Sequence, residues 1–254
     1  MIWIALAAFF ASVLTFFSGF GLGTLLLAVM AIFFPLELAI VLTAIVHFAN
    51  NLFKFALIGK WVDKKTLFWF GITALPAAFL GALILSFFKN EDVMLTYSLA
   101  NHQFGISWLG IIIGSLLIFF ALIDELPLWS KLPKSKISLS AGGALSGFFG
   151  GFSGHQGALR SLFLVHAGLN KEAYIATGTA IALIIDAARI PTYFAEGFLL
   201  KVEHLPTLVA AVLSAFTGAI AGRYLLTKIT IKVVHRIVLV LLIMLGLLIA
   251  LGII

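Results

Sequence analysis

Glycine, histidine, glutamine and arginine residues stand together inside a long apolar tract, in the stretch GGFSGHQGALRSLF at residues 150–163. Glycines interrupt helices, and the start of a new helix exposes unpaired N–H groups that carry about +0.5 of an elementary charge. Such a helix start binds anions, and the planar fork of Arg160 suits the paired oxygens of a sulfonate, sulfite or carboxylate. We therefore predict a substrate-binding segment that comprises Ser153, Gly154, His155, Gln156, Gly157 and Arg160.

The same residues also have structural explanations. The glycines can serve close helix packing, and Arg160 can reach toward water or pair with a carboxylate. His155 can donate to an anion, carry a proton, or pack as a neutral imidazole. The sequence leaves these alternatives open.

A second, less polar glycine stretch occurs early in the chain. FFSGFGLG at residues 16–23 corresponds to FFGGFSGHQG at residues 148–157. If both stretches are broken helices, two helix starts meet near the middle of the membrane. This pairing adds Ser18, Gly19 and Gly21 to the predicted substrate-binding residues.

A polar stripe follows the first glycine stretch, at Thr43, His47, Asn50, Asn51 and Lys54. These positions are i, i+4, i+7, i+8 and i+11, so they share one face of a helix. A polar face on a spanning helix faces protein or water rather than lipid. We predict that the amides of Asn50 and Asn51 bind substrate oxygens and that His47 takes part in coupling or charge pairing, whereas Lys54 can snorkel.

The corresponding helix of the second half carries Thr177, Thr179, Asp186, Arg189 and Tyr193. Asp186 and Arg189 are three residues apart, so the favoured interpretation is that they neutralise each other on one helix. Asp186 can alternatively carry a coupling proton or pair with Arg160. Thr177 and Thr179 are added to the predicted substrate-binding residues.

The composition places these residues in a membrane protein. Of 254 residues, 63% are hydrophobic and 10% are charged, against about 25% charged in soluble domains. The mean hydropathy is +1.20, and apolar runs of about 20 residues, enough to cross roughly 30 Å of hydrocarbon, recur throughout. We predict an all-α integral membrane protein with eight hydrophobic segments, at residues 2–34, 38–58, 67–88, 104–123, 138–167, 173–195, 205–226 and 233–254.

The polar linker at residues 124–137 divides the chain into a first membrane repeat, 1–123, and a second one, 138–254. Corresponding loops of the two repeats carry opposite charge. The loop at 59–65 is basic and its counterpart at 196–203 acidic, whereas the loop at 89–103 is acidic and its counterpart at 223–232 basic. By the positive-inside rule they lie on opposite sides of the membrane, so the repeats are inverted.

Inversion requires an odd number of crossings per repeat, although each repeat has four apolar segments. The simplest solution is that the first segment of each repeat is broken at its glycines and re-enters, which puts the linker inside and both termini outside. Eight plain crossings are the alternative.

Several chemistries have no support in the sequence. Cysteine is absent, and the remaining histidines fit no metal-ligand spacing. There is no phosphate-binding loop and no serine-hydrolase motif. The basic residues stand in short loops, which encodes orientation and not nucleic-acid binding. We expect no cofactor, no metal and no enzymatic activity.

These motifs resemble the sulfite exporter TauE/SafE family of membrane permeases, over essentially the whole chain. The most specific part is GHQGALRSLFLVHAGLNKEAYIATGTAIALIIDAARIPTYF at residues 154–194. The resemblance implies two homologous repeats and export of sulfur-containing anions such as sulfite or sulfoacetate. The family's second-half motif falls on Gly154, His155, Gln156, Gly157 and Arg160, while SGFGLGTLLLAVM is less glycine-rich than the family's usual opening.

The sequence thus predicts a multi-pass secondary transporter in the inner (plasma) membrane that exports a small sulfur-containing anion. Its partners are the anion and the lipid bilayer, with a homo-oligomer left open. One alternative is a proton- or cation-coupled carrier that uses Asp186. Another is an intramembrane enzyme or assembly factor that uses His155.

Overall fold

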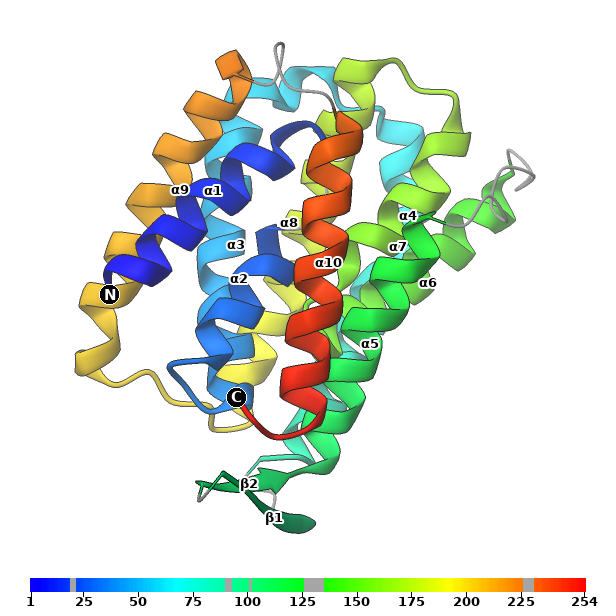
Figure 1. The fold of residues 1–254 in the computed structure, drawn as a ribbon. Coiled ribbons are helices and arrows are strands. Elements are labelled where there is room, and N and C mark those ends of the chain that lie inside the picture. Colours follow the sequence, from blue (N-terminus) through cyan, green and yellow to red (C-terminus); the bar gives the residue numbers. More distant parts are fainter. Residues whose placement is uncertain (19–21, 90–92, 101, 126–134, 226–230) are drawn as a thin grey trace.

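The computed structural model describes residues 1–18, 22–89, 93–100, 102–125, 135–225 and 231–254, and the side chains in these ranges except those of 15–18, 123–125, 223, 225 and 231–238. The chain folds into a bundle of helices (Figure 1). The first half contains α1 (Ile2–Ser18), α2 (Leu22–Ala31), α3 (Leu36–Ile58), α4 (Lys64–Ser86) and α5 (Trp108–Glu125). The second half contains α6 (Lys136–Ser153), α7 (Gln156–Leu164), α8 (Lys171–Ala195), α9 (Leu205–Leu225) and α10 (Ile231–Ala250).

Several helices suit a membrane. Among the described residues, four are long and apolar enough to cross one, namely Leu36–Trp61, Lys64–Ser86, Lys171–Ala195 and Val202–Gly222. Further apolar helices are shorter, including Leu22–Ala31 and Trp108–Leu122. The expectation of a helical membrane protein is therefore confirmed.

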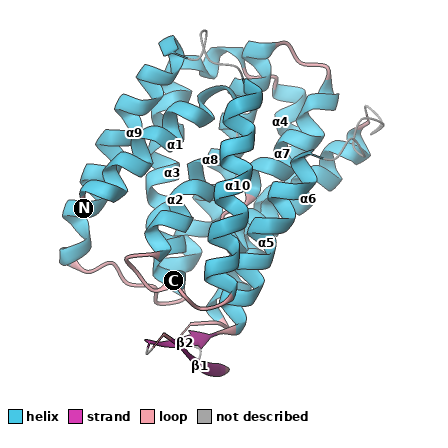
Figure 2. Ribbon diagram, viewed as in Figure 1, coloured by secondary structure: helices cyan, strands magenta, loops and turns pink. Residues whose placement is uncertain are grey.

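The prediction for residues 104–123 is wrong at the beginning of the segment. Residues 104–106 were expected to open a spanning helix, but they belong to a β-hairpin, β1 (Leu95–Leu99) and β2 (His102–Ile106). Tyr97 faces Phe104 across the hairpin, and its hydroxyl donates to the Leu251 carbonyl at 2.8 Å. The hairpin lies at one end of the bundle (Figure 2). The strands were missed because five residues give too short an alternation of side chains to be recognised next to a long apolar run.

The two halves pack against each other in a reciprocal pattern. Helix α4 packs against α6 and α1 against α9, while α3 packs on α8 and α5 on α10. A glycine in each half permits a close approach of this kind. A Cβ on Gly81 of α4 would clash with the Phe148 carbonyl of α6, and one on Gly218 of α9 would clash with the Phe9 carbonyl of α1. Small residues let helix backbones come this close where packing, and not water exclusion, holds helices together.

The apolar core has two main parts. The larger joins α2 and α3 to α1, α5, α9 and α10. The smaller joins α4 to α7 and α8. Because α3 packs on α8, the polar faces of these two helices meet inside the bundle.

Candidate functional site

The second glycine stretch is a break between two helices. Helix α6 ends at Ser153, Gly154 adopts a left-handed conformation with φ +82°, and α7 begins at Gln156. Two carbonyl groups at the end of α6 are bonded by α8: Arg189 Nη1 donates to the Gly150 oxygen at 2.9 Å, and the Tyr193 hydroxyl donates to the Gly151 oxygen. Because α8 satisfies these carbonyls, the broken backbone is tolerated inside the bundle.

The opposite side of the break is the start of α7. Its N-cap residue is His155, and no side chain caps the first N–H groups of the helix. His155 is 1% exposed, its Nδ1 lies 2.8 Å from the Ser153 hydroxyl, and its ring stacks on Phe120 at 5.8 Å. Within the described part of the chain, its Nε2 has no hydrogen-bond partner. The first N–H groups of α7 and the Nε2 atom of His155 can therefore each form a further hydrogen bond.

A hydrogen-bond network centred on Asp186 joins three helices. His47 Nδ1 of α3 lies 2.7 Å from Oδ2 of this carboxylate. Gln156 Nε2 of α7 and Arg189 Nε of α8 donate to Oδ1 at 3.0 and 2.9 Å. Arg160 Nη1 donates to Gln156 Oε1 at 3.2 Å. The predicted pairing of Asp186 with Arg189 is confirmed, and Gln156 links Arg160 to the same carboxylate.

The polar stripe of α3 is buried as a unit. Asn51 Nδ2 donates to the His47 carbonyl at 2.9 Å, while Asn50 Oδ1 accepts from Ser12 of α1 at 3.3 Å. Asn50 Nδ2 is buried with no hydrogen-bond partner among the described residues. Lys54 is 5% exposed, so it does not snorkel, and it lies within electrostatic range of Arg160. No pattern in the sequence points to Ser12 or Phe120, because a lone serine or phenylalanine in an apolar helix is ordinary.

The buried charges are unequal in sign. Among the residues whose side chains the structure describes, the buried cations are Lys54, Arg160 and Arg189, and the buried carboxylate is Asp186. Arg160 lies within electrostatic range of both Lys54 and Asp186. Burying charge away from water is costly unless an opposite charge compensates it. Among the described side chains at the centre of the bundle, basic groups outnumber carboxylates.

The first glycine stretch reaches the same place. A Cβ on Gly23, in the first turn of α2, would lie 3.4 Å from the Gly154 carbonyl oxygen and 3.5 Å from the His47 ring. The beginning of α2 therefore lies beside the break between α6 and α7. Gly19, Gly21 and the side chain of Ser18 fall outside the described residues.

Three predicted residues make other contacts. Thr177 accepts a hydrogen bond from the Asp63 backbone N–H at 2.9 Å, and the Thr179 hydroxyl donates to the Ile175 carbonyl at 2.8 Å. Gly157 contributes its carbonyl, which accepts from the Ser161 hydroxyl. The first of these hydrogen bonds joins α8 to the turn before α4, the second lies within α8 and the third within α7. None of them joins the Asp186 network.

Asp63 itself lies in the turn before α4, outside the spanning helices. Hydrogen bonds from the hydroxyl and the backbone N–H of Thr66 hold the pKa of the Asp63 carboxyl below its usual value. This carboxylate is the N-cap of α4.

With regard to metals, no three His, Cys, Asp or Glu side chains within the described ranges come together as ligands.

Nearly the whole chain is similar to one known family. The sequence model of a family described as sulfite exporter TauE/SafE matches residues 4–249, nearly the whole chain. No curated protein and no solved structure matches the chain. The resemblance inferred from the motifs is therefore confirmed at the level of the family.

Proposed function

This chain belongs to the sulfite exporter TauE/SafE family, whose members are membrane transporters and not enzymes, and we propose that it exports a small sulfur-containing anion across the inner membrane. Sulfite, sulfoacetate or a related organosulfonate is the proposed substrate. The anion binds at the break between α6 and α7, next to the start of α2.

The observation that carries this proposal is the excess of buried positive charge. Lys54, Arg160 and Arg189 outnumber Asp186 among the described buried charges. A cation would add to this excess, whereas an anion would reduce it. Asp186 already accepts from His47, Gln156 and Arg189, which argues against the rival proposal that this carboxylate binds a cation.

Hydrogen-bonding capacity left at the start of α7 and on α3 supports the same ligand. The start of α7 has no side-chain cap, and Asn50 Nδ2 is a buried donor without a partner in the described chain. An oxyanion takes such donors, and a helix start favours negative charge. In this proposal the backbone of Gly154–Gly157, with Arg160, Gln156 and Asn50, surrounds the anion.

The packing pattern supports inverted repeats with re-entrant first segments. Exchanging α1–α5 with α6–α10 converts the α4–α6 contact into the α9–α1 contact and leaves the α3–α8 and α5–α10 contacts unchanged. Helices α2 and α7 have 10 and 9 residues, so each extends only about 15 Å at 1.5 Å per residue, half of the hydrocarbon core. Each therefore suits the second arm of a hairpin that turns back near the membrane centre.

Inverted repeats around a central site are the usual basis of alternating access. Here the His47–Asp186 bond joins α3 of one repeat to α8 of the other, so relative movement of the repeats has to change it. We assign His47, Asp186 and Arg189 to coupling or charge pairing on this ground. An inside-negative potential favours outward anion movement by about 2.3 kcal/mol per charge per 100 mV, so export needs no ATP.

Flux in sealed vesicles tests this function. Purified protein in liposomes loaded with sulfite or sulfoacetate should release the anion faster when an imposed potential is negative inside, and more slowly when it is positive. Arg160→Ala should reduce this flux about 30-fold or more, since removing one partner of a buried charge-assisted contact costs about 2–5 kcal/mol. Arg160→Lys keeps the charge and loses the fork, so its flux should be intermediate.

A control lies on α9, where Thr217 is exposed and its hydroxyl donates to the Ser214 carbonyl of the same helix. Thr217→Val should transport within about twofold of the unaltered protein, in line with the usual size of effects away from a site. Unchanged transport of every tested anion by Arg160→Ala would show that the assignment of Arg160 is wrong. Turnover of a compound without translocation would contradict transport altogether.

A further inference from the structure

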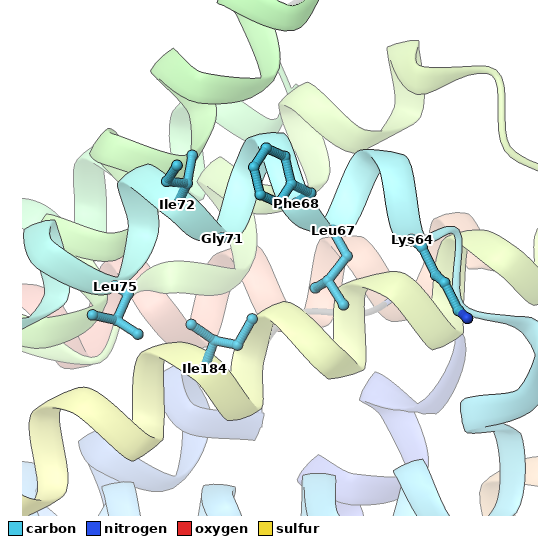
Figure 3. A pocket seen from close by; sticks show the side chains of 7 residues that line it. All are labelled: Lys64, Leu67, Phe68, Gly71, Ile72, Leu75 and Ile184. Carbon is cyan, nitrogen blue, oxygen red and sulfur yellow. The ribbon is translucent and has the colours of Figure 1, made fainter.

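An open groove runs along the outside of α4, where it meets α8 (Figure 3). Its volume is about 550 Å³, within the range of roughly 300–1,000 Å³ typical of small-molecule sites. Its lining consists of Lys64, Leu67, Phe68, Gly71, Ile72, Leu75 and Ile184. Apart from Lys64, every lining residue is apolar.

The length of the lining matches the thickness of one membrane leaflet. Six of its residues occupy positions i, i+3, i+4, i+7, i+8 and i+11 of α4, which share one helix face. From Lys64 to Leu75 the face extends about 16 Å at 1.5 Å per residue, roughly half of a 30 Å hydrocarbon core. A lipid acyl chain in the groove would therefore begin at Lys64 and end near the membrane centre.

Gly71 makes the middle of the groove. It has no side chain, and a Cβ at this position would lie 3.2 Å from Ile184 Cδ1 of α8. Ile184 thus comes close to the α4 backbone here, while Phe68 and Ile72 remain more than half exposed beside it. The result is an apolar hollow between ridges.

The polar end of the groove is basic and aromatic. Lys64 follows the exposed residue Lys60, whose ammonium group lies over the Trp61 ring at 4.3 Å. Trp and Lys side chains gather at the level of lipid headgroups. The nearby carboxylate, Asp63, is engaged in capping α4 through Thr66. Positive charge is therefore available for a phosphate at this end.

We propose that the groove between α4 and α8 is a binding site for one anionic phospholipid, with its headgroup phosphate at Lys64 and one acyl chain along α4. The lipid would lie against helices of both repeats and would stabilise their contact. This site is separate from the break between α6 and α7 and does not depend on the nature of the transported anion.

Lipid-dependent stability tests the site. The thermal midpoint of the purified protein is measured in detergent with increasing phosphatidylglycerol or phosphatidylcholine, because a ligand of the folded state raises its stability. Phosphatidylglycerol should act at lower concentration than phosphatidylcholine. Lys64→Gln should weaken its apparent affinity about fivefold, the equivalent of about 1 kcal/mol per basic residue.

The matched control is Lys65→Gln, which removes the same charge from an exposed neighbour outside the groove and should leave the affinity unchanged. Gly71→Leu fills the groove and should abolish the preference between the two lipids while Lys64 is still present. Equal stabilisation by both lipids, or equal losses in Lys64→Gln and Lys65→Gln, would overturn the proposal in favour of general lipid or charge effects.

Discussion

The two short helices that follow the glycine stretches, α2 and α7, differ in polarity. Helix α2 reads LGTLLLAVMA and is buried except for Val29. Helix α7 reads QGALRSLFL and brings Gln156 and Arg160 into the centre of the bundle. Both helices therefore lie beside the break, but charged and amide side chains are concentrated in α7.

The longer helices compensate for this difference. The first half supplies His47, Asn50, Asn51 and Lys54 from α3, and the second half supplies the anchoring carboxylate, Asp186, from α8. The site is thus assembled from both halves, but its charge pairing depends on the second. Three predictions test this asymmetry.

Loss of the Asp186 carboxylate, in the second half, should have the largest effect on stability. In Asp186→Ala the buried Arg189 loses its counter-charge, and removing one partner of a buried ion pair costs about 3–5 kcal/mol. His47→Ala removes a hydrogen-bond partner of the same carboxylate and should cost about 1–2 kcal/mol. The measurement is the thermal midpoint in detergent, with Asp186→Asn as the milder variant if Asp186→Ala does not fold. An equal loss in His47→Ala would mean that the halves contribute alike.

Glycine-to-alanine substitutions beside the starts of α2 and α7 should change the stability with opposite sign. Gly154→Ala forces a side chain into a left-handed conformation next to Arg189 Nη1, at a cost of about 1–2 kcal/mol. Gly23 is helical, and its new Cβ would meet only ordinary contacts, so Gly23→Ala should be neutral or stabilising by up to about 1 kcal/mol. Thermal midpoints of both variants measure the contrast. Destabilisation of both to the same extent would show that the start of α2 is as constrained as the break before α7.

The smallest effect concerns helix caps outside the membrane. Asp63 caps α4 with a carboxylate and Asn170 caps α8 with an amide. The pKa of Asp63 is lowered by hydrogen bonds from Thr66, so its stabilisation is complete above the ordinary carboxyl pKa of about 3.9 and disappears as the pH falls through the lowered value. Asp63→Ala should cost about 1 kcal/mol at neutral pH.

The pH dependence distinguishes the two caps. The difference between Asp63→Ala and the unaltered protein should shrink in acid, whereas the loss in Asn170→Ala should be the same at both pH values. Asp63→Asn keeps a cap and should remove the acid dependence. Thermal midpoints at pH 7 and at the lowest pH that the folded protein tolerates provide the comparison. A pH-independent loss in Asp63→Ala would contradict the role of its ionised form.

Much of the fold could be predicted because helices in apolar surroundings are defined locally. The segment predicted at 38–58 is Leu36–Ile58 in the structure, and that at 173–195 is Lys171–Ala195. A break within residues 138–167 was also predicted, because glycines lower helix stability. The structure has it at Gly154, whereas the adjacent glycines Gly150 and Gly151 lie inside α6. The hairpin at Leu95–Ile106 was not, since its stability comes from pairing between strands and from the contact of Tyr97 with Leu251.

The sequence by itself determined that the chain is a helical membrane protein, that its polar residues lie on defined helix faces, and that the second glycine stretch is broken. Periodicity and composition are sufficient for these properties. Only the tertiary structure decided that His47 and not Arg160 contacts Asp186 directly, that Lys54 is buried, and that Thr177 and Thr179 lie outside the network. These outcomes depend on how α3, α7 and α8 are placed against one another, and the spacing of residues along one helix contains no information on the position of its neighbours.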